Sequence, residues 1–524
     1  METQIQPTEM SQGENDLRQL TSTIKEEIGK GADKNESLVS SAFIYRVPEY
    51  LRKLNESAYT PRLIAIGPLH RKDKHLQTSL QHVKMSYTNY LLSRLTRGME
   101  DLQELAEQTK FTVLQKCLGE MKTSIDDAKK YYAEDVALDE VMLLVDGCFI
   151  LEFLCRLSHG ITKILHFKKQ GERAKDPIFG NSLNFYNVMY DLVLLENQIP
   201  FFVLEKLFPL TVGQIPDNNR SLTDYLRYYS YKMRPVRNSN NSSSAKTWCS
   251  PGDCVLRVYG STTAPEDDLS KQKKTAAEVG EEGEEEEEEE EQQQQQVQSG
   301  NTNDQRTSKY YHILHNLHDG YLPFNQRKQK KPSGKVVRMP SASELVYAGV
   351  KFVPDDSGSN LFEIKFIEPK GLFWWCCGAR FVIPPLTIYS TTEFFLRNLI
   401  ALEQCCPGVS EHVSSYAWLM DMLVDDDKDV LVLEKAGVLR NHMGPTKDAT
   451  DLFNKLGKEI TLGHYFNKPC RQANEYSKRF WARNMAHLRR TYLASPWTFI
   501  AFCIGVMAFV MSFVEFVRSF DKKG

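Results

Sequence analysis

The feature that most constrains this chain is an apolar run close to its C-terminus. Residues 497–514 form a stretch of eighteen residues without a charge. As a helix, residues 496–517 would extend roughly 33 Å, which is enough to cross a hydrocarbon layer of about 30 Å. Ser495 can cap this helix, Pro496 suits its first turn, and Trp497 suits the membrane interface. We therefore expect a transmembrane helix over residues 496–517; the alternative is a buried core helix.

Four small side chains would share one face of this helix. They are Ala501, Gly505, Ala508 and Ser512. Small residues let two membrane helices approach closely, so this face predicts a homo-oligomer formed through the transmembrane helix. The alternative is that the four residues have no such role, because small residues are common in membrane helices.

The N-terminus indicates how such an anchor would be inserted. The first twenty residues contain neither the basic region nor the apolar region of a secretory signal. Insertion of the C-terminal anchor after synthesis would leave the body in the cytosol. We therefore expect a single-pass protein of the plasma membrane or endoplasmic reticulum. Five glycosylation sequons favour the opposite topology, since they are modified only in a translocated chain; they begin at Asn35, Asn55, Asn219, Asn240 and Asn241.

Composition divides the rest of the chain into four regions. Residues 1–39 are a polar N-terminal tail, whose one helical pattern consists of Leu17, Leu20, Ile24 and Ile28. Residues 40–233 and 336–494 are expected to form one helical body. Residues 234–335 are rich in Ser and Asn, then in Glu and Gln, and cannot bury enough apolar surface to fold. We expect a disordered insertion there, with one short helix near residues 309–318.

The charge distribution argues against a nucleic-acid partner. The formal net charge is −3, and eleven of the glutamates are concentrated in residues 278–291. The basic residues 327–331 could be read as a nuclear import signal, yet the nearby acidic run favours a solvated linker. We therefore expect a membrane and an unidentified protein as partners, and no nucleic acid.

Apolar periodicity predicts a mainly α fold. Residues 76–95 space their apolar side chains three and four apart, which is typical of one stripe of an amphipathic helix. Residues 136–157 and 181–208 are apolar over most of their circumference and are expected to be core helices. Pro200 should break the second, because it lacks the helical N–H and clashes with the preceding turn.

The segment after the insertion predicts a small antiparallel β-sheet. Its strand candidates are residues 349–353, 361–367 and 379–389, and apolar side chains alternate with charged ones in the second. Helical patterns resume after residue 389. The expected fold is thus a multi-helix globular body with a small sheet, a disordered insertion and one C-terminal transmembrane helix.

The sequence contains no recognised catalytic motif and predicts no cofactor. His312, His315 and His318 could line one helix face as metal ligands, but no cysteine or carboxylate lies at ligand spacing. A second candidate for cation binding is an acidic cluster that lacks the glycine and glutamate of an EF-hand, so a helix N-terminus explains it better. The cluster consists of Asp425, Asp426, Asp427 and Asp429. Eleven cysteines show no regular spacing and are expected to be reduced.

Several long segments resemble the plant domain-of-unknown-function 247 family. They are IYRVPEYLRKLNESAYTPRLIAIGPLH, LLVDGCFILEF, DLVLLENQIPFFVLEKLF, SASELVYAGVKF and IPPLTIYSTTEFFLRNLIALEQ. The resemblance begins near Phe43 and reaches the C-terminus outside the insertion. Leu69 stands where the family typically has an aromatic residue, whereas His70 is kept. The resemblance implies a plant protein with one C-terminal span and no established enzymatic activity; some grass members act in self-incompatibility, and others are tied to stress responses.

Two functions from different classes follow from these observations. The first is a membrane-anchored interaction or signalling protein, in which the family-motif residues form turns, caps and core contacts. These residues are Arg46, Pro48, Asn55, Tyr59, Pro61, Gly67, Pro68, His70, Glu196, Asn197, Pro200 and Phe201. The alternative is an enzyme whose site combines His70, Glu196 and Asn197. An open cleft around these three would favour the enzyme, and a solid core would favour the interaction protein.

Overall fold

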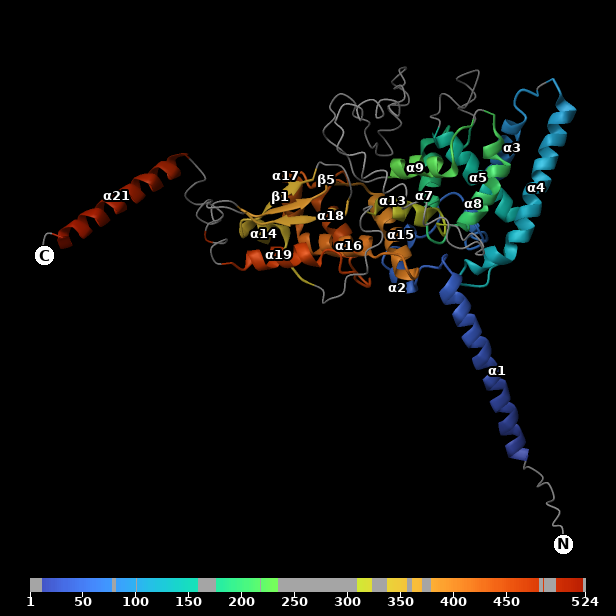
Figure 1. Cartoon of the computed structure of the whole chain (residues 1–524), viewed down its shortest axis with the longest axis horizontal. Helices are drawn as coiled ribbons and strands as arrows, with labels where there is room; N and C mark the ends of the chain where they lie inside the picture. The colour runs from blue at the N-terminus through green and yellow to red at the C-terminus, as the bar shows by residue number, and fades with distance from the viewer. Residues whose placement is uncertain are drawn as a thin grey trace, which may run out of the picture.

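Helices are the main elements of the computed structural model (Figure 1). The structure describes residues 12–77, 82–99, 101–158, 176–216, 218–233, 309–322, 337–355, 361–369, 378–479, 484 and 496–521. The helices before the insertion are α1 (Gln12–Ser41), α2 (Glu49–Arg52), α3 (His82–Leu95), α4 (Gln103–Lys130), α5 (Glu140–Ser158), α7 (Ser182–Asp191), α8 (Phe201–Leu207) and α9 (Leu222–Met233). Those after it are α13 (Ile313–Tyr321), α14 (Ala342–Tyr347), α15 (Thr392–Cys405), α16 (His412–Leu423), α17 (Asp427–Lys435), α18 (Thr446–Leu456), α19 (Asn467–Ser477) and α21 (Pro496–Asp521). Short 3-10 turns cover Glu56–Ala58, Lys74–Leu76, Phe208–Leu210 and Val212–Gln214.

Helix α5 is the centre of the N-terminal half. Every residue from Met142 to Ser158 is buried, and α3, α4, α8 and α9 pack around the helix. This confirms the core helix predicted over residues 136–157, since a helix that is apolar on all sides must be covered on all sides. Helix α3 confirms the predicted amphipathic stripe, although it begins later than residue 76.

The predicted break at Pro200 is confirmed. Helix α7 ends at Asp191, and α8 begins at Phe201 directly after Pro200, which acts as its N-cap residue. The nine residues between the two helices form a buried loop (residues 192–200) instead of a continuous helix. This loop brings backbone and side-chain polar groups into the middle of the apolar core.

The sheet prediction is correct in location but only partly correct in topology. Strands β1 (Lys351–Pro354), β3 (Arg380–Ile383) and β2 (Lys365–Ile367) lie in that spatial order. Strand β2 is antiparallel to β3, but β1 is parallel to β3, with Phe352 opposite Phe381. The expected antiparallel sheet is therefore a mixed sheet. The chain forms β1 and β2 first, and β3 then lies between them, parallel to β1 and antiparallel to β2. Parallel pairing needs such a crossover.

A second, two-stranded sheet lies beside it. Strand β4 (Leu386–Ile388) pairs in parallel with β5 (Leu439–Asn441), and α15, α16 and α17 form the connection between them. Helix α17 begins with a capping box, in which the side chains of Asp426 and Asp429 bind backbone amides of the first turn. This confirms that the acidic cluster marks a helix N-terminus.

One apolar core joins the two halves of the body. Buried side chains from Ile44 to Tyr476 form a single cluster. The N-terminal helices and the sheet-containing half lie at opposite ends of the long axis, with α13 and α15 between them (Figure 1). Asn398 of α15 links the halves directly: its Nδ2 donates to the Ala58 carbonyl at 2.8 Å, and its Oδ1 accepts from the Leu195 amide at 3.1 Å.

The predicted disordered insertion lies mostly outside the described residues. The part that the structure describes, residues 309–322, contains the short helix that the sequence predicts, as α13. Its apolar side chains are buried in the core, so this segment belongs to the body.

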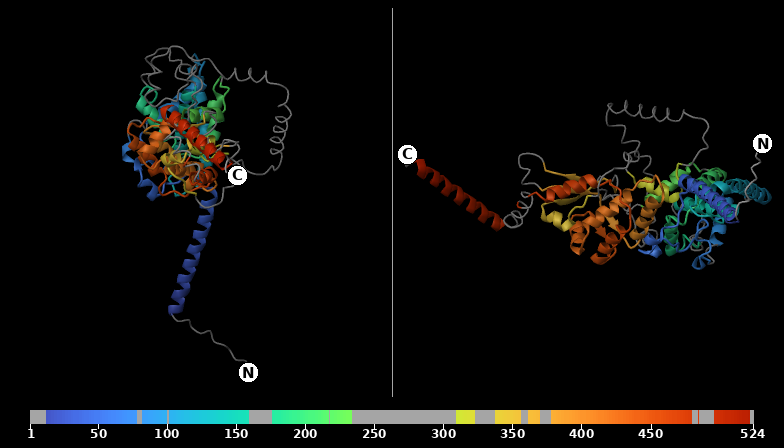
Figure 2. Two further views of the ribbon diagram at one scale, coloured as in Figure 1. Left: turned by 90° about the vertical axis from the view of Figure 1, so that its left-hand side faces the viewer. Right: turned by 90° about the horizontal axis from the view of Figure 1, so that it is seen from below.

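Two long helices project from the body at its ends (Figure 2). Helix α1 covers the predicted helical pattern, and each of its residues from Asp16 to Lys30 is exposed. Helix α21 begins at Pro496, as predicted, and Trp497 is its second residue.

The prediction of a transmembrane helix over residues 496–517 is wrong. Among the residues that the structure describes, no helix combines the length and the apolar character needed to cross a membrane. The uncharged run ends at residue 514, and Glu515, Arg518 and Asp521 belong to the same helix. The expected pairing of two copies through Ala501, Gly505, Ala508 and Ser512 depends on that span and stays untested.

Candidate functional site

Most of the family-motif residues lie in or around one extended stretch of chain, residues 43–77, which we call the motif segment. It contains only the short elements α2, Glu56–Ala58 and Lys74–Leu76. A buried extended segment must have its backbone groups satisfied by partners other than its own helix or sheet bonds. Carboxylate and amide side chains from α5, α7 and the loop 192–200 supply those partners.

Asp191, at the end of α7, binds three consecutive amides of the motif segment. Its Oδ1 accepts from the Arg62 amide, and its Oδ2 accepts from the amides of Leu63 and Ile64, each at 2.8 Å. The side chain is fully buried. Burial raises the pKa of Asp191 to about 6, against the opposing effect of the three amides.

Asn197 and Asp146 hold the next residues of the motif segment. The Ile66 amide donates to Asn197 Oδ1 at 2.7 Å, while Asn197 Nδ2 donates to the Ile64 carbonyl at 3.0 Å. The Gly67 amide donates to Asp146 Oδ2 at 2.8 Å. A planar side-chain amide that donates and accepts in this way extends the segment's hydrogen bonding as a neighbouring strand would.

Gly67 must be a glycine because of its backbone conformation and its surroundings. Its φ is +69°, in the region that L side chains rarely adopt. A Cβ at this position would lie 2.5 Å from the Gln198 carbonyl oxygen, which also accepts from the Tyr132 hydroxyl at 3.0 Å.

Glu196 is surrounded by positive and donor groups. Its Oε1 accepts from the Val47 amide at 2.6 Å and from the Arg52 guanidinium, and its Oε2 lies 3.1 Å from His70 Nε2. Arg46 Nη1 lies 3.7 Å from the same Oε2. Burial alone would raise the pKa of Glu196, but the contact with His70 and the positive charge of Arg52 outweigh it, so the pKa is lowered.

The arrangement brings two of the three candidate catalytic residues together and turns the third away. His70 Nε2 lies 3.1 Å from Glu196 Oε2, and His70 Nδ1 lies 2.7 Å from Asp73 Oδ2. Asn197 instead binds the backbone of residues 64 and 66 and the Asp191 carbonyl. All three candidates are buried. Asn197 and the Oε1 atom of Glu196 make hydrogen bonds within the body, whereas His70 Nε2 and Glu196 Oε2 face each other without hydrogen-bond geometry.

The remaining motif residues act as caps, turns and packing groups. Pro48 precedes α2, and Asn55 precedes the Glu56–Ala58 turn and accepts from the Ser57 hydroxyl at 2.7 Å. Tyr59 is buried beneath the Arg52 guanidinium. The Pro61 carbonyl binds His75 Nε2, and Pro68 lies in a turn beside Gly67. The Phe201 amide donates to the Tyr311 carbonyl at 2.8 Å.

Asp146, Asp191 and Asn398 are site residues that sequence reasoning did not assign. Asp146 and Asp191 interrupt otherwise apolar helices, which was the available signal, because a charge in a buried helix needs a specific partner. Nothing in the sequence indicates which amides they bind, since the motif segment lies more than 75 positions away along the chain.

The three candidate metal-ligating histidines, His312, His315 and His318, contact neighbouring parts of the body. His312 Nε2 lies 3.1 Å from the Phe43 carbonyl, and His318 Nε2 lies 2.7 Å from Glu403 Oε1. The ring of His315 stacks on Tyr311 with 4.3 Å between centroids. Within the described ranges, no group of His, Cys, Asp and Glu side chains is arranged to hold a metal ion.

We expect acid to weaken the docking of α13. Burial lowers the pKa of His312 from 6.5 to about 3. In the unfolded chain this histidine takes up a proton near pH 6.5, so below that pH the unfolded state binds more protons and stability falls as the pH decreases toward 3. Lowering the pH from 7 to 5 should reduce the free energy of unfolding by about 2 kcal/mol through His312 alone.

Denaturant unfolding at both pH values, with His312→Asn as control, measures this effect. Asparagine keeps an N-cap acceptor but does not titrate. Asp191 shifts in the opposite sense, because its raised pKa adds stability as the pH falls below 6. The difference between parent and variant therefore isolates the histidine. An equal loss of stability in both proteins would contradict the prediction.

The fold and the site define a mainly helical protein whose motif residues organise its own backbone. The family model described as "Plant protein of unknown function", DUF247, matches residues 44–511. The chain therefore belongs to this plant family. It is 24% identical to UPF0481 protein At3g47200 of Arabidopsis thaliana over 501 residues, covering 92% of this chain and 88% of the relative. It is 22% identical to Putative UPF0481 protein At3g02645 of the same plant over 504 residues, covering 89% and 88%. No solved structure gives a significant match.

Proposed function

We propose that this chain is a protein-interaction module that binds an amphipathic helix of a partner protein through α1. The observation that supports this most directly is the apolar stripe on α1. Leu17, Leu20, Ile24 and Ile28 are between 45% and 66% exposed. At about 100° per residue, these four side chains fall within an arc of about 80° on one side of the helix.

The charges beside the stripe indicate the kind of helix that would fit. On the helical wheel, Arg18 and Lys25 flank the stripe on one side, and Asp16 and Glu27 flank it on the other. A partner helix with acidic residues facing the first pair and basic residues facing the second would bury the stripe and complement both flanks.

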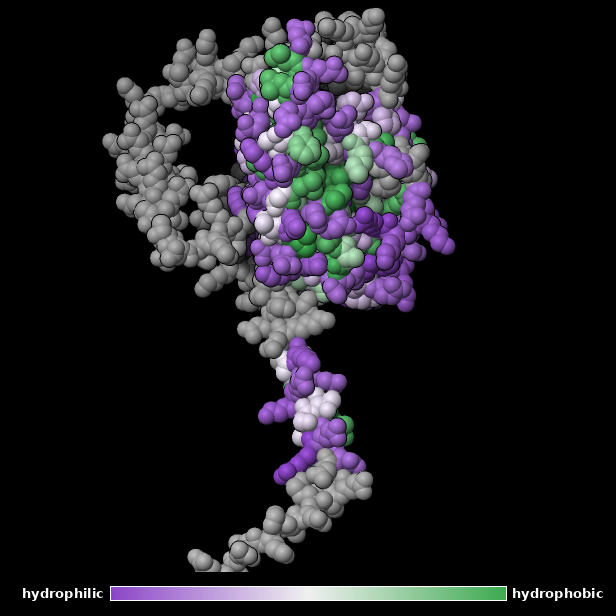
Figure 3. All heavy atoms as spheres, turned by 90° about the vertical axis from the view of Figure 1, so that its right-hand side faces the viewer, coloured by the Kyte–Doolittle hydropathy of each residue, from purple (hydrophilic) through white to green (hydrophobic). Residues whose placement is uncertain are grey.

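The body supplies a second apolar surface close to the same end of the molecule. Figure 3 shows apolar side chains gathered in a band over the face that carries α4. Leu105 and Phe111 of α4 are 52% and 63% exposed, and Met85 and Tyr90 of the adjacent α3 are also exposed. Apolar side chains gathered on one exposed face, as in Figure 3, commonly mark interaction surfaces.

The buried motif residues also support an interaction module over an enzyme. Glu196 Oε1 accepts from the Val47 amide and the Arg52 guanidinium, and the oxygens of Asp191 accept from three backbone amides. Glu196 Oε2 faces His70 Nε2 inside the body at 3.1 Å, without hydrogen-bond geometry. Catalysis requires a group that can reach a substrate. These groups instead hold the motif segment against the core.

Photo-crosslinking in plant cells tests the proposal. A photoreactive residue at Thr21, next to the stripe, should join the full-length chain to a protein partner. The double substitution Leu20→Glu with Ile24→Glu should reduce this product by at least about tenfold, because two buried apolar contacts become charged. Gln19→Glu with Ser22→Glu adds the same charge to the opposite face and should leave the product unchanged. A product that persists in the first variant, or its absence from the parent, would refute the proposal.

A further inference from the structure

Helix α1 presents its apolar stripe to solvent. It is 30 residues long, which corresponds to roughly 45 Å, and it points away from the body (Figure 2). Each residue from Asp16 to Lys30 is exposed, and none of the four stripe residues belongs to the buried core of the described chain. Most of the stability of a protein helix comes from the packing of its apolar face. The stripe therefore requires a partner that covers it.

The two flanks of the stripe carry charges of opposite sign. Arg18 and Lys25 lie about 95–115° from the centre of the stripe on one side, which we call the basic flank. Asp16 and Glu27 lie about 65–85° from the centre on the other side, which we call the acidic flank. A helix with one basic and one acidic flank can complement a copy of itself, provided that unlike flanks meet.

The orientation of two such helices decides which flanks meet. In a parallel pair the two-fold axis runs between the helices along their length, so the basic flank of each copy lies opposite the acidic flank of the other. In an antiparallel pair each flank lies opposite the same flank of the other copy, and like charges meet. When a parallel pair is in register, Arg18 of one copy and Asp16 of the other differ by only about 3 Å in height, as do Lys25 and Glu27.

We infer that the helix bound by α1 is the α1 of a second copy of this chain, paired in parallel and in register; this rests on the proposed function, because it names the partner of the same stripe. The pair buries the stripe of both copies and places opposite charges along both edges of the contact. The remaining charges between residues 16 and 30 do not oppose it, because Glu26 and Lys30 lie on the far side of the helix and pair with each other at 2.6 Å.

The mass of the purified full-length chain tests self-pairing. At about 100 μM, where association of micromolar affinity is nearly complete, light scattering should give twice the 60.2 kDa of one copy. The double substitution Leu20→Glu with Ile24→Glu should return the mass to that of one copy, because the buried stripe would become charged. A doubled mass that persists in this variant would place the association on another surface and overturn the inference.

Charge reversal tests the parallel orientation. Arg18→Glu with Lys25→Glu makes both flanks acidic, and Asp16→Lys with Glu27→Lys makes both basic; each change should raise the dissociation constant at least about tenfold. All four substitutions together exchange the flanks and should restore the parent affinity to within about threefold. In an antiparallel pair every one of these chains would still bring like charges together. Equal dissociation constants, or no recovery in the fourfold variant, would overturn the parallel arrangement. Since α1 lies outside the core, the thermal unfolding of the body should be the same in every variant.

A cysteine at the centre of the stripe tests the register. Ile24 lies closest to the centre, so in a parallel pair in register it faces its own counterpart. Mild oxidation should link two copies of the Ile24→Cys chain, whereas Ser22→Cys, on the opposite face, should give no more linked product than the parent. An Ile24→Cys chain that forms no more linked dimer than Ser22→Cys would overturn the pairing.

Failure of self-pairing and failure of the proposed function give different results. If the purified chain stays monomeric while the Thr21 photoproduct contains a different protein, self-pairing is refuted and the proposed function stands. If neither a dimer nor a photoproduct forms, both are refuted. A photoproduct that contains two copies of this chain, together with a dimeric purified chain, is the result expected of a parallel α1 pair.

Discussion

Replacing Gly67 with alanine is expected to lower the free energy of unfolding by about 2–5 kcal/mol. The backbone conformation alone should cost about 1–2 kcal/mol, because a Cβ is disfavoured at positive φ. The rest arises from overpacking, typically about 1–3 kcal/mol. The added carbon would lie 2.5 Å from the Gln198 carbonyl oxygen, which is backbone and cannot rotate away. Moving the segment would also strain the bond from the Gly67 amide to Asp146.

Two other glycines separate these contributions in a denaturant titration. Gly98 has a φ of +88°, and a Cβ added there would have no heavy atom within 4 Å, so Gly98→Ala should show the backbone cost alone. Gly119 lies in α4 with equally open surroundings, and Gly119→Ala should be neutral or stabilising by up to about 1 kcal/mol. If Gly67→Ala loses no more stability than Gly98→Ala, the close approach of Gln198 is not what requires glycine.

The substitution Asp191→Ala is expected to be similarly damaging, at about 3–5 kcal/mol. It removes the acceptor for three successive backbone amides, and each buried donor left without a partner costs about 1–3 kcal/mol. The contacts of the Arg62 and Leu63 amides are only partly buried, so these two amides can recover some of this from water. We therefore expect less than the full sum, with the motif segment loosened before the rest of the body.

Hydrogen exchange and denaturant unfolding together measure this effect. The amides of Arg62, Leu63 and Ile64 should lose protection in the Asp191→Ala variant. The matched control is Asp224→Ala at the exposed start of α9, where the carboxylate accepts from Ser221. That change should cost only about 0.5–1 kcal/mol. Retained protection of the three amides in Asp191→Ala would show that the segment does not depend on this carboxylate.

Local patterns in the sequence were sufficient for several of the helices, although α4 was not predicted. The alternating apolar spacing before residue 95 identified α3, and the apolar runs around Cys148 and Tyr190 identified α5 and α7. Pro200 marked the start of α8, because the loss of its N–H and its ring clash act within a single turn, whereas α7 ends nine residues earlier, at Asp191. The N-terminus of α17 was likewise indicated by the neighbouring aspartates.

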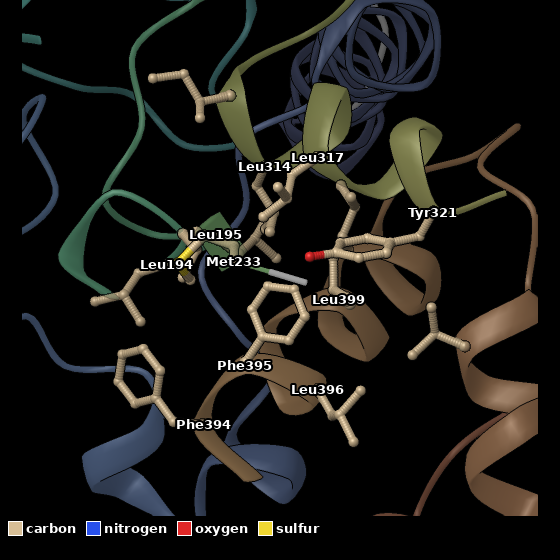
Figure 4. Packing of buried hydrophobic residues seen from close by; sticks show 14 of the residues in the cluster. Leu194, Leu195, Met233, Leu314, Leu317, Tyr321, Phe394, Phe395, Leu396 and Leu399 are labelled. Atoms are coloured by element: carbon tan, nitrogen blue, oxygen red, sulfur yellow. The ribbon is translucent and has the colours of Figure 1, made fainter. Parts of the chain in front are cut away.

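Pairing and assembly could not be read in the same way. The parallel partnership of β1 and β3 depends on how the chain returns through space, which strand composition does not record. Helix α13 is buried because it packs against α9 and α15, which lie elsewhere in the sequence (Figure 4). Composition does not record these contacts, and it therefore placed α13 within the disordered insertion expected over residues 234–335. The C-terminal segment forms the expected helix, Pro496–Asp521. The further prediction that this helix spans a membrane is wrong.

The sequence by itself therefore located the core helices α3, α5 and α7 and indicated which family the motifs resemble, because these properties depend on residues within a few turns of each other. Only the tertiary structure decided what the motif residues do. Asp191, Glu196 and Asn197 stand close together in the sequence, yet their partners lie more than a hundred positions away in the motif segment. Those contacts arise when the chain folds back on itself, and local sequence patterns do not specify the position to which it returns.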